Sequence, residues 1–449
     1  MKIILFGAGK KTINFLEGEE SLKYDIQSVV DNDRNKQGTE LCCGDRRLKV
    51  IAAEDIFKYD FSMILITIDN SEHQIDIMKQ LIKLGVSYNE IKFLKNGQII
   101  KRDIEEMPGK IIQGDNLSIS ICQIDGKKFF WCGDTNACDP LNECAKQGKL
   151  YIDGGLLSIA MLGKGTFLDI GANIGGVSLA FAACGWNGYS IEAADNNCRL
   201  LEKSIVLNDF DIKCINKGIW NNSVKLYFRE YGPYGTVSTE RTDNACEIEA
   251  TSLDDLMRTE LKCCSKINFI KMDIEGSEVE ALAGAKEMLS FFDYPPIFVE
   301  ANAWTLALVD NKTTIDLKCM AESYGYRVYR WDDNIWKKYS KKTFWDELCT
   351  DYILVHKNDT REWITISDEE YPVPSEVETV RRISDVLKKA VEDWGNKEIV
   401  GLQYQELVAT ACSLRDFPQI AKQKDISHLL EQLIDVSKSD DLLSKILRR

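Results

Sequence analysis

The chain has few histidines, few prolines and no metal-binding cysteine pattern. Of its 449 residues, 3 are His and 8 are Pro, and no two of its 15 cysteines form a Cys-x-x-Cys pair. The cysteine spacing fits no common zinc knuckle, so we interpret these residues as reduced, mostly buried thiols. We interpret all three histidines, His73, His356 and His428, as structural. A carboxylate is therefore the better candidate wherever a general base is needed.

Long apolar runs and an excess of positive charge are also missing. No run approaches the ~18 apolar residues of a membrane span, and the N-terminus has no cleavage-site pattern. The net charge is −15 with a pI near 4.9. Nucleic acids and anionic membranes bind best to basic protein surfaces, so neither is expected as the main partner. The composition, 44% hydrophobic and 28% charged, is typical of a globular protein, and we expect a cytoplasmic one.

Residues 166–192, TFLDIGANIGGVSLAFAACGWNGYSIE, carry the most informative pattern. They predict a strand ending at Asp169, a glycine turn, a helix of small apolar residues, and a second strand ending at Glu192. Glycines let a backbone approach a ligand, a helix N-terminus offers free N–H groups, and an acid after the second strand can accept ribose hydroxyls. A nucleoside ligand is indicated, although a tight turn in an unrelated α/β fold would give a similar pattern.

Strands and helices alternate for about 200 residues around this stretch. This alternation predicts a largely parallel sheet covered on both faces. Acids again follow two strands, Asp273 after residues 267–272 and Glu300 after residues 296–299. We expect one helix over residues 279–289 and a loop over residues 231–238. Further strands are predicted at residues 212–215, 224–228, 326–330 and 352–356, and residues 248–256 predict a strand that leads to the start of a helix.

The first 109 residues read as a separate α/β unit. A strand, Gly7-Ala8-Gly9, a helix and a strand ending at Asp31 make a nucleotide-binding outline, but Thr12 holds the place of the third glycine. The unit resembles the Rossmann-like N-terminal domains of sugar-modifying enzymes. Two interpretations stay open, a bound nucleotide or nucleotide-sugar and a scaffold that only packs.

The segments on either side of the central region are simpler. Residues 117–123 and 127–131 alternate around Asp125-Gly126 and predict a hairpin, which we interpret as part of a linker that becomes a lid. A polar linker over residues 367–376 precedes helical patterns at residues 377–394, 403–414 and 426–447. We interpret this helical tail as a packing element, which could also form the interface of a homo-oligomer.

The central motifs resemble the FkbM family of S-adenosylmethionine (SAM) methyltransferases in order and spacing. LDIGANIGGVSLAFA, IEAADNNCRLLEKSIVLN, ATSLDDLM, INFIKMDIEGSEVEALAGAKEML and PIFVEAN carry the resemblance, over residues 150–356. It implies a class I methyltransferase core, Rossmann-like, at residues 110–360. A small Rossmann-like domain at residues 1–109 precedes it, and a helical region at residues 376–449 follows. Lys217-Gly218 departs from the small residue pair usual in the family, so the resemblance implies no adenine contact at this pair.

The resemblance also implies roles for individual residues. Glu192 should hold the ribose of SAM, and Asp273 should lie at the sulfonium. Because the histidines are interpreted as structural, acceptor deprotonation falls to Asp273 and Glu275, with Glu278 and Glu300 as further candidates. Alternatively, Glu278 serves the dipole at the N-terminus of the following helix and Glu275 only caps that helix. These acids could also bind Mg²⁺, but we assign no metal ligand. The methionine part of SAM should contact the glycine turn, at Asp169, Gly171, Ala172, Asn173 and Gly175.

The expected function is SAM-dependent O-methylation of a hydroxyl, most naturally on a sugar of a glycan or glycosylated metabolite. The partner would then be a small molecule or glycan. Two alternatives belong to other classes. One is a nucleotide-sugar or NAD-dependent enzyme run by the N-terminal unit. The other is a non-catalytic SAM-binding assembly protein.

Overall fold

The computed structural model describes most of the chain and divides it into two compact units. It describes residues 1–437 except 96, 101–109, 115–116, 135–140, 142–143, 145–146, 149, 151, 232–233, 242–244, 340–347, 361–363 and 396–401. The expected domain boundary at residue 109 lies outside the described residues. Unit 1 holds Met1–Tyr151 with Arg199–Asp211, and unit 2 holds Ile152–Cys198 with Ile212–Arg449.

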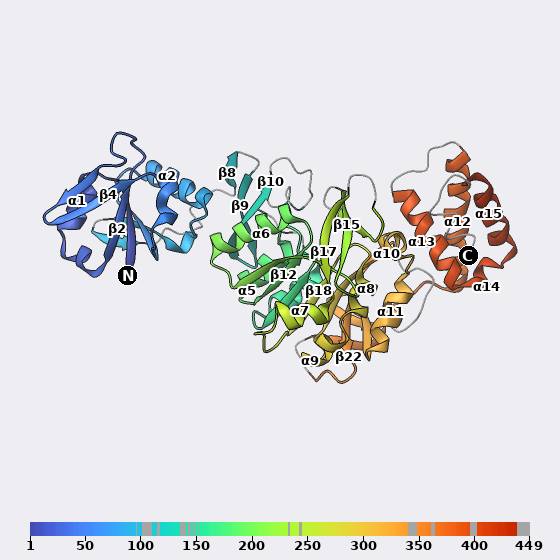
Figure 1. Cartoon of the computed structure of the whole chain (residues 1–449). Helices are drawn as coiled ribbons and strands as arrows, with labels where there is room; N and C mark the ends of the chain where they lie inside the picture. The colour runs from blue at the N-terminus through green and yellow to red at the C-terminus, as the bar shows by residue number, and fades with distance from the viewer. Residues whose placement is uncertain are drawn as a thin grey trace. The chain divides into compact units, whose positions relative to one another are not determined.

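Unit 1 begins with a Rossmann-like sheet in the order β3-β4-β2-β1-β5-β6-β7 (Figure 1). Its central strand β1 is parallel to β2 on one side and to β5 on the other. The apolar residues Ile3 and Leu5 of β1 and Val29 of β2 are fully buried. Burial on both faces of a parallel sheet is what continuous apolar runs in a sequence indicate. The elements are β1 (Lys2–Phe6), α1 (Lys10–Glu17), η1 (Glu19–Lys23), β2 (Asp25–Val30), β3 (Glu40–Cys43), β4 (Arg46–Ile51), η2 (Ala53–Lys58), β5 (Met63–Ile66), α2 (Ser71–Leu84), η3 (Tyr88–Glu90), β6 (Ile91–Lys95) and β7 (Gln98–Ile100).

A three-stranded antiparallel sheet completes unit 1. It contains β8 (Lys110–Gly114), β9 (Leu117–Ile124) and β10 (Lys127–Asp134). The predicted hairpin is confirmed, because Asp125 and Gly126 both have positive φ, 46° and 73°, as a two-residue turn requires. On β10, the Cys132 N–H donates to Ser204 Oγ at 2.9 Å and the Phe130 N–H to Asn208 Oδ1 at 2.8 Å.

Unit 2 is built on a nine-stranded sheet in the order β13-β12-β11-β18-β19-β22-β20-β21-β23. Its first five strands pair in parallel in the doubly wound order 3-2-1-4-5, and β22 then joins β19 antiparallel. This is the class I methyltransferase core that the sequence predicts. The strands are β11 (Thr166–Ile170), β12 (Asn187–Glu192), β13 (Ile212–Asn216), β18 (Phe269–Met272), β19 (Ile297–Asn302), β20 (Tyr326–Asp332), β21 (Ile335–Lys338), β22 (Cys349–His356) and β23 (Ile366–Glu370).

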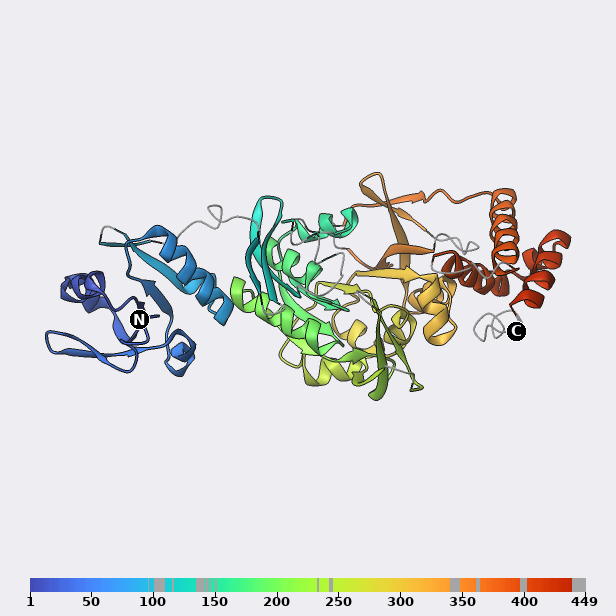
Figure 2. The same cartoon turned by 90° about the horizontal axis from the view of Figure 1, so that it is seen from above.

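Helices and a smaller sheet accompany this core (Figure 2). The smaller sheet has the order β14-β17-β15-β16. The helices are α4 (Gly154–Ala160), α5 (Gly176–Cys184), α6 (Asp195–Asn208), α7 (Leu253–Thr259), α8 (Glu278–Ala283), α9 (Lys286–Phe291), α10 (Ala303–Asp310) and α11 (Thr314–Ser323), and the strands are β14 (Gly218–Ile219), β15 (Val224–Tyr231), β16 (Tyr234–Ser238) and β17 (Cys246–Thr251).

Several elements differ from the sequence-based prediction. The expected loop at 231–238 contains strand β16, because it pairs antiparallel with β15 and Gly235 leaves room for the Phe228 ring. The expected single helix at 279–289 is two helices, α8 and α9. They break at Gly284, where a Cβ would lie 2.8 Å from the Trp220 carbonyl oxygen. Strands β11 and β19 run past Asp169 and Glu300, so neither acid ends its strand.

The C-terminal helices pack on the core through α10. Ile383, Leu407 and Leu433 share a buried cluster with Ala307 of α10. The expected polar linker overlaps strand β23, and the expected last helix ends with α15, its part beyond residue 437 lying outside the described residues. No described helix is long and apolar enough to cross a membrane. The helices are α12 (Glu376–Gly395), α13 (Leu402–Asp416), α14 (Pro418–Ala421) and α15 (Lys424–Val436).

Candidate functional site

The glycine turn between β11 and α5 has the conformation that its sequence predicts. Gly171 has φ +79° and Gly175 has φ +93°, values that L side chains rarely adopt. A Cβ on Gly171 would lie 1.8 Å from the backbone oxygen of Asp273. The N–H groups of Gly171 and Ala172 both donate to the Ile191 carbonyl at 3.0 Å. The turn is therefore fixed between the ends of β12 and β18.

Glu192 lies beside this turn at the end of β12. Its Oε2 accepts the Asn173 N–H and its Oε1 accepts the Ala194 N–H, both at 2.8 Å. Burial raises the pKa of this carboxyl, while the two backbone donors act in the opposite direction. Each carboxylate oxygen keeps a further lone pair, so Glu192 could still accept ribose hydroxyls. The structure thus brings Glu192, Ala172, Asn173 and the turn glycines together, as expected.

Asp169 lies beneath the turn, with none of its surface exposed. Its Oδ2 accepts the Ser178 hydroxyl at 2.5 Å, and its Oδ1 lies 3.4 Å from Lys271 Nζ. The Ser178 bond occupies Oδ2, whereas Oδ1 is buried and accepts no hydrogen bond among the described residues, with the ammonium as its ion-pair partner. In this structure, Asp169 supports the floor of the turn, and its role in contacting methionine stays a prediction.

Lys271 is a site residue that the sequence-based reasoning missed. Its Nζ donates to the Gly171 carbonyl at 2.8 Å and lies 3.3 Å from Asp273 Oδ2. Burial alone would lower the pKa of this ammonium, but the carboxylates of Asp273 and Asp169 outweigh it and raise the pKa. The sequence did contain a signal for Lys271, because it is a charged residue inside the apolar strand INFIKM. A buried charge of this kind needs a partner of opposite charge.

Asp273, Glu275 and Glu300 form an acidic cluster at the carboxyl ends of β18 and β19. One carboxylate oxygen from each lies within 4.8 Å of the others. Burial, then the charges of Asp273 and Glu278, raise the pKa of Glu275 to about 8. The charge of Asp273, then burial, raises the pKa of Glu300. Carboxylates this close share protons or hold a hard divalent cation such as Mg²⁺.

Glu278 shapes the turn that carries Glu275. Its carboxylate accepts the Ile274 N–H at 2.9 Å and the Gly276 N–H at 3.0 Å. Burial raises its pKa to about 7, although these donors oppose the rise. Glu275 itself has φ 51°, in the left-handed region, a strained conformation that persists only when its surroundings fix it. Glu278 therefore positions the turn from inside.

Asp351 adds a fourth acid that the sequence did not indicate. It lies on β22 directly opposite Glu300 of β19, so both side chains share one face of the sheet. Burial, followed by the charges of Asp153 and Asp273, raises its pKa to about 7. Asp153 itself caps α4, accepting the Gly155 N–H at 2.7 Å. The antiparallel insertion of β22 was not predicted, so its register could not be used to find this residue.

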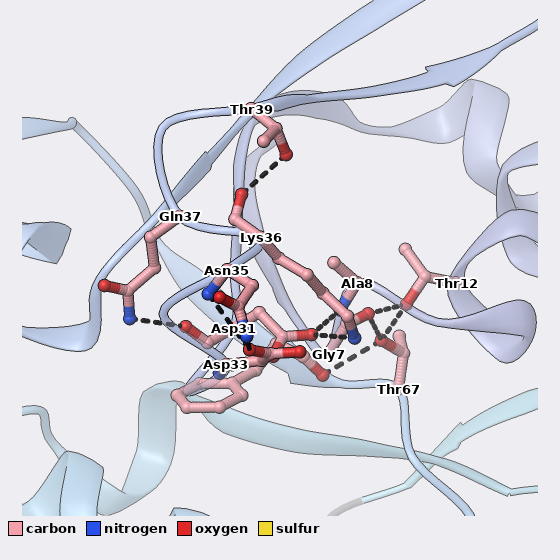
Figure 3. A network of polar contacts seen from close by, with 11 residues as sticks. Gly7, Ala8, Thr12, Asp31, Asp33, Asn35, Lys36, Gln37, Thr39 and Thr67 are labelled. Atoms are coloured by element: carbon pink, nitrogen blue, oxygen red, sulfur yellow. Dashed lines mark hydrogen bonds and ion pairs between the residues drawn. The ribbon is translucent and has the colours of Figure 1, made fainter.

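The nucleotide-binding outline of unit 1 is closed by its own side chains (Figure 3). Asp31 accepts the Ala8 N–H at 2.7 Å, the Asp33 N–H at 2.9 Å and the Lys36 ammonium at 3.0 Å. Burial would raise the pKa of Asp31, but these donors lower it. Thr12 donates to the Gly7 carbonyl beneath the turn. A ribose would have to compete with these donors, which favours the scaffold interpretation of this unit.

Comparison with known proteins adds two family matches. Residues 169–328 match the methyltransferase FkbM domain, and residues 1–92 match the family described as C2185-like, N-terminal. No curated protein matches the chain.

Three solved structures are similar to this chain at low identity. Methyltransferase FkbM from Methylobacillus flagellatus KT is 14% identical, covers 79% of this chain and 90% of its own, and has a TM-score of 0.28. A TehB-like SAM-dependent methyltransferase from Corynebacterium glutamicum ATCC 13032 Kitasato is 11% identical, with 48% and 94% covered and a TM-score of 0.30. UDP-D-quinovosamine 4-dehydrogenase from Vibrio fischeri is 18% identical, with 23% and 95% covered and a TM-score of 0.19.

Similarity at this level does not indicate a shared substrate. The sheet order, the glycine turn and the family match agree with one another. This chain therefore carries a methyltransferase domain of the FkbM type at residues 169–328, preceded by a separate N-terminal domain of another family at residues 1–92.

Proposed function

We propose that this protein is a SAM-dependent O-methyltransferase that acts on a sugar hydroxyl in a glycan or glycosylated metabolite. One observation carries the proposal: the glycine turn lies directly against the turn that begins at Asp273. The two backbones are so close that a Cβ on Gly171 would overlap the Asp273 carbonyl. A cofactor bound along the glycine turn would thus present its reactive end to the acidic cluster.

The residues of the turn fit SAM. Helix α5 begins at Gly176 after a glycine N-cap that makes no side-chain cap hydrogen bond. The N-cap residue therefore does not occupy the first N–H groups of the helix, which suit a carboxylate such as that of methionine. Glu192 supplies the acceptor that a ribose diol needs. When bound, SAM supplies a methyl group on a sulfonium, which is already activated for transfer.

The acidic cluster fits the removal of a proton from a hydroxyl acceptor. In an in-line displacement the acceptor oxygen bonds to the methyl carbon, the sulfur–carbon bond breaks, and a nearby base takes the hydroxyl proton. Asp273 adjoins the glycine turn directly, and its Oδ2 lies 3.3 Å from the Lys271 ammonium, so its position makes it our candidate base. Glu275, with a pKa of about 8, is mostly protonated at pH 7 and would donate a hydrogen bond to the acceptor.

The charge of the site favours an acceptor without negative groups near the methylated position. Asp273, Glu275, Glu300 and Asp351 adjoin one another, and Lys271 is already engaged by Asp273 and Asp169. A phosphate or carboxylate would be repelled by those of the four acids that are ionised. Neutral hydroxyls can hydrogen-bond to carboxylates, as the hydroxyls of a sugar would.

The test is methyl transfer from labelled SAM to glycans from a strain that lacks this protein. Mass spectrometry should show the gain of one CH₂ per methyl group transferred. Asp273→Asn should keep the fold and affinity for S-adenosylhomocysteine while losing turnover by ~10²–10⁴-fold. Glu249→Gln, at an exposed position on β17, is the matched control and should turn over normally. Wild-type turnover by Asp273→Asn would place the base elsewhere, with Glu300 as the next candidate.

A further inference from the structure

Lys271 is buried in the central sheet, yet the proposed chemistry gives it no direct part. Only 6% of its surface is exposed. It lies opposite Asp169 in the parallel register of β11 and β18, so the two side chains share a face of the sheet. Three oxygen atoms lie around its ammonium, one as a hydrogen-bond acceptor and two as ion-pair partners. They are the Gly171 carbonyl at 2.8 Å, Asp273 at 3.3 Å and Asp169 at 3.4 Å.

These three contacts join parts of the site that would otherwise be separate. Gly171 belongs to the cofactor turn, Asp169 to the floor beneath it, and Asp273 to the acceptor side. Four other acids lie near Asp273. They are Glu275 of the following turn, Glu278 of α8, Glu300 of β19 and Asp351 of β22. Each of these acids repels the Asp273 carboxylate when it is ionised, whereas the Lys271 ammonium attracts it.

We propose that Lys271 is a positioning residue that holds the Asp273 carboxylate at a fixed distance from the cofactor turn. The inference rests on the proposed function, because it assigns the purpose of that distance to methyl transfer. Without the ammonium, the Asp273 side chain would lose the ion pair that links it, through Lys271 and the Gly171 carbonyl, to the cofactor turn. A displacement of about 1 Å at a reacting group can cost ~10²-fold in rate.

A purely structural role is the main competing explanation. Lys271 also balances the buried charge of Asp169, and removing one partner of a buried pair destabilises a protein. Stability alone would therefore not separate the two roles. A second substitution can do so, because Asp169→Asn removes the buried charge that needs balancing and leaves Asp273 unchanged.

The experiment compares Lys271→Met, Asp169→Asn and the double variant with the wild type. Turnover is measured at saturating SAM, along with melting temperature and affinity for S-adenosylhomocysteine. Lys318→Met is the matched control. Lys318 lies on α11 and is also buried, at 2% exposed, but its ammonium lies over the ring of Tyr339. It should lose stability and keep its turnover per folded molecule.

The positioning role predicts that the double variant recovers the melting temperature of Asp169→Asn but turns over ~10- to 100-fold more slowly. Recovery of both properties, or wild-type turnover by Lys271→Met, would overturn it. If the wild type transfers no methyl group to any acceptor, the proposed function fails. In that case, the positioning role of Lys271 is tested only by the affinity for S-adenosylhomocysteine. Loss of its bond to Gly171 should weaken S-adenosylhomocysteine binding about tenfold in the double variant relative to Asp169→Asn, and equal affinities would refute the inference.

Discussion

The acidic cluster should make the protein less stable as the pH rises from 6 to 8, and Glu275 should account for much of this loss. The pKa of Glu275 is about 8 in the folded protein, against 4.5 ordinarily. Over this range the unfolded chain carries an ionised Glu275, whereas the folded protein still binds the proton. Stability therefore falls as pH rises through the folded pKa. Integrating between pH 6 and pH 8 gives a loss of about 2 kcal/mol from this group.

Glu275→Gln should remove this share of the pH dependence. Urea unfolding at pH 6 and pH 8 measures it, because the wild type should lose more stability between the two values than the variant does. Glu278 and Asp351, each with a pKa of about 7, act in the same direction and remain in both proteins. The exposed Glu249→Gln serves as control and should keep the wild-type slope. Equal slopes for Glu275→Gln and the wild type would refute the assignment of a buried, protonated Glu275.

Three further predictions concern other parts of the chain. Glu192→Ala should weaken SAM or S-adenosylhomocysteine binding by ~1–3 kcal/mol in calorimetry, through a lost charge-assisted contact; unchanged affinity would remove the ribose assignment. A fragment of residues 1–109 should fold alone, and its nucleotide-binding hypothesis fails if NAD, UDP-sugars and GDP-sugars all leave its melting temperature unchanged. Truncation after residue 375 should lower the melting temperature of the remainder, because it uncovers Trp304 and Ala307; an unchanged value would show that the tail adds no stability.

The parallel half of the core could be predicted from the sequence because its signals are local. Strands β11 and β18 are short, mainly apolar runs followed by turns that contain glycine and acid residues, and β12 ends with the acid Glu192. Glycine positions such as Gly171 and Gly175 have one backbone conformation that other residues rarely adopt. Local patterns of this kind place Glu192 and Asp273 at one edge of the sheet without knowledge of tertiary contacts.

The parts that were missed depend on pairing between distant segments. Strand β16 forms because it pairs with β15, although the segment 231–238 that contains it is rich in glycine and aromatic residues. Asp351 reaches the site because β22 enters the sheet antiparallel beside β19. Lys271 could have been identified from its apolar strand, but its partners depend on the register between β11 and β18. Register is a tertiary property that a single strand sequence does not specify.

The contact between Gly171 and the backbone of Asp273 has a consequence for how this enzyme type can diversify. With no space for a side chain between the two turns, neither can be remodelled without displacing the other. Inherited changes of acceptor preference should therefore accumulate elsewhere on the site, where Asp351 enters from the antiparallel strand β22. A library randomised at residue 351 should yield altered acceptor ranges more often than one randomised at residue 171, which should yield mostly inactive proteins.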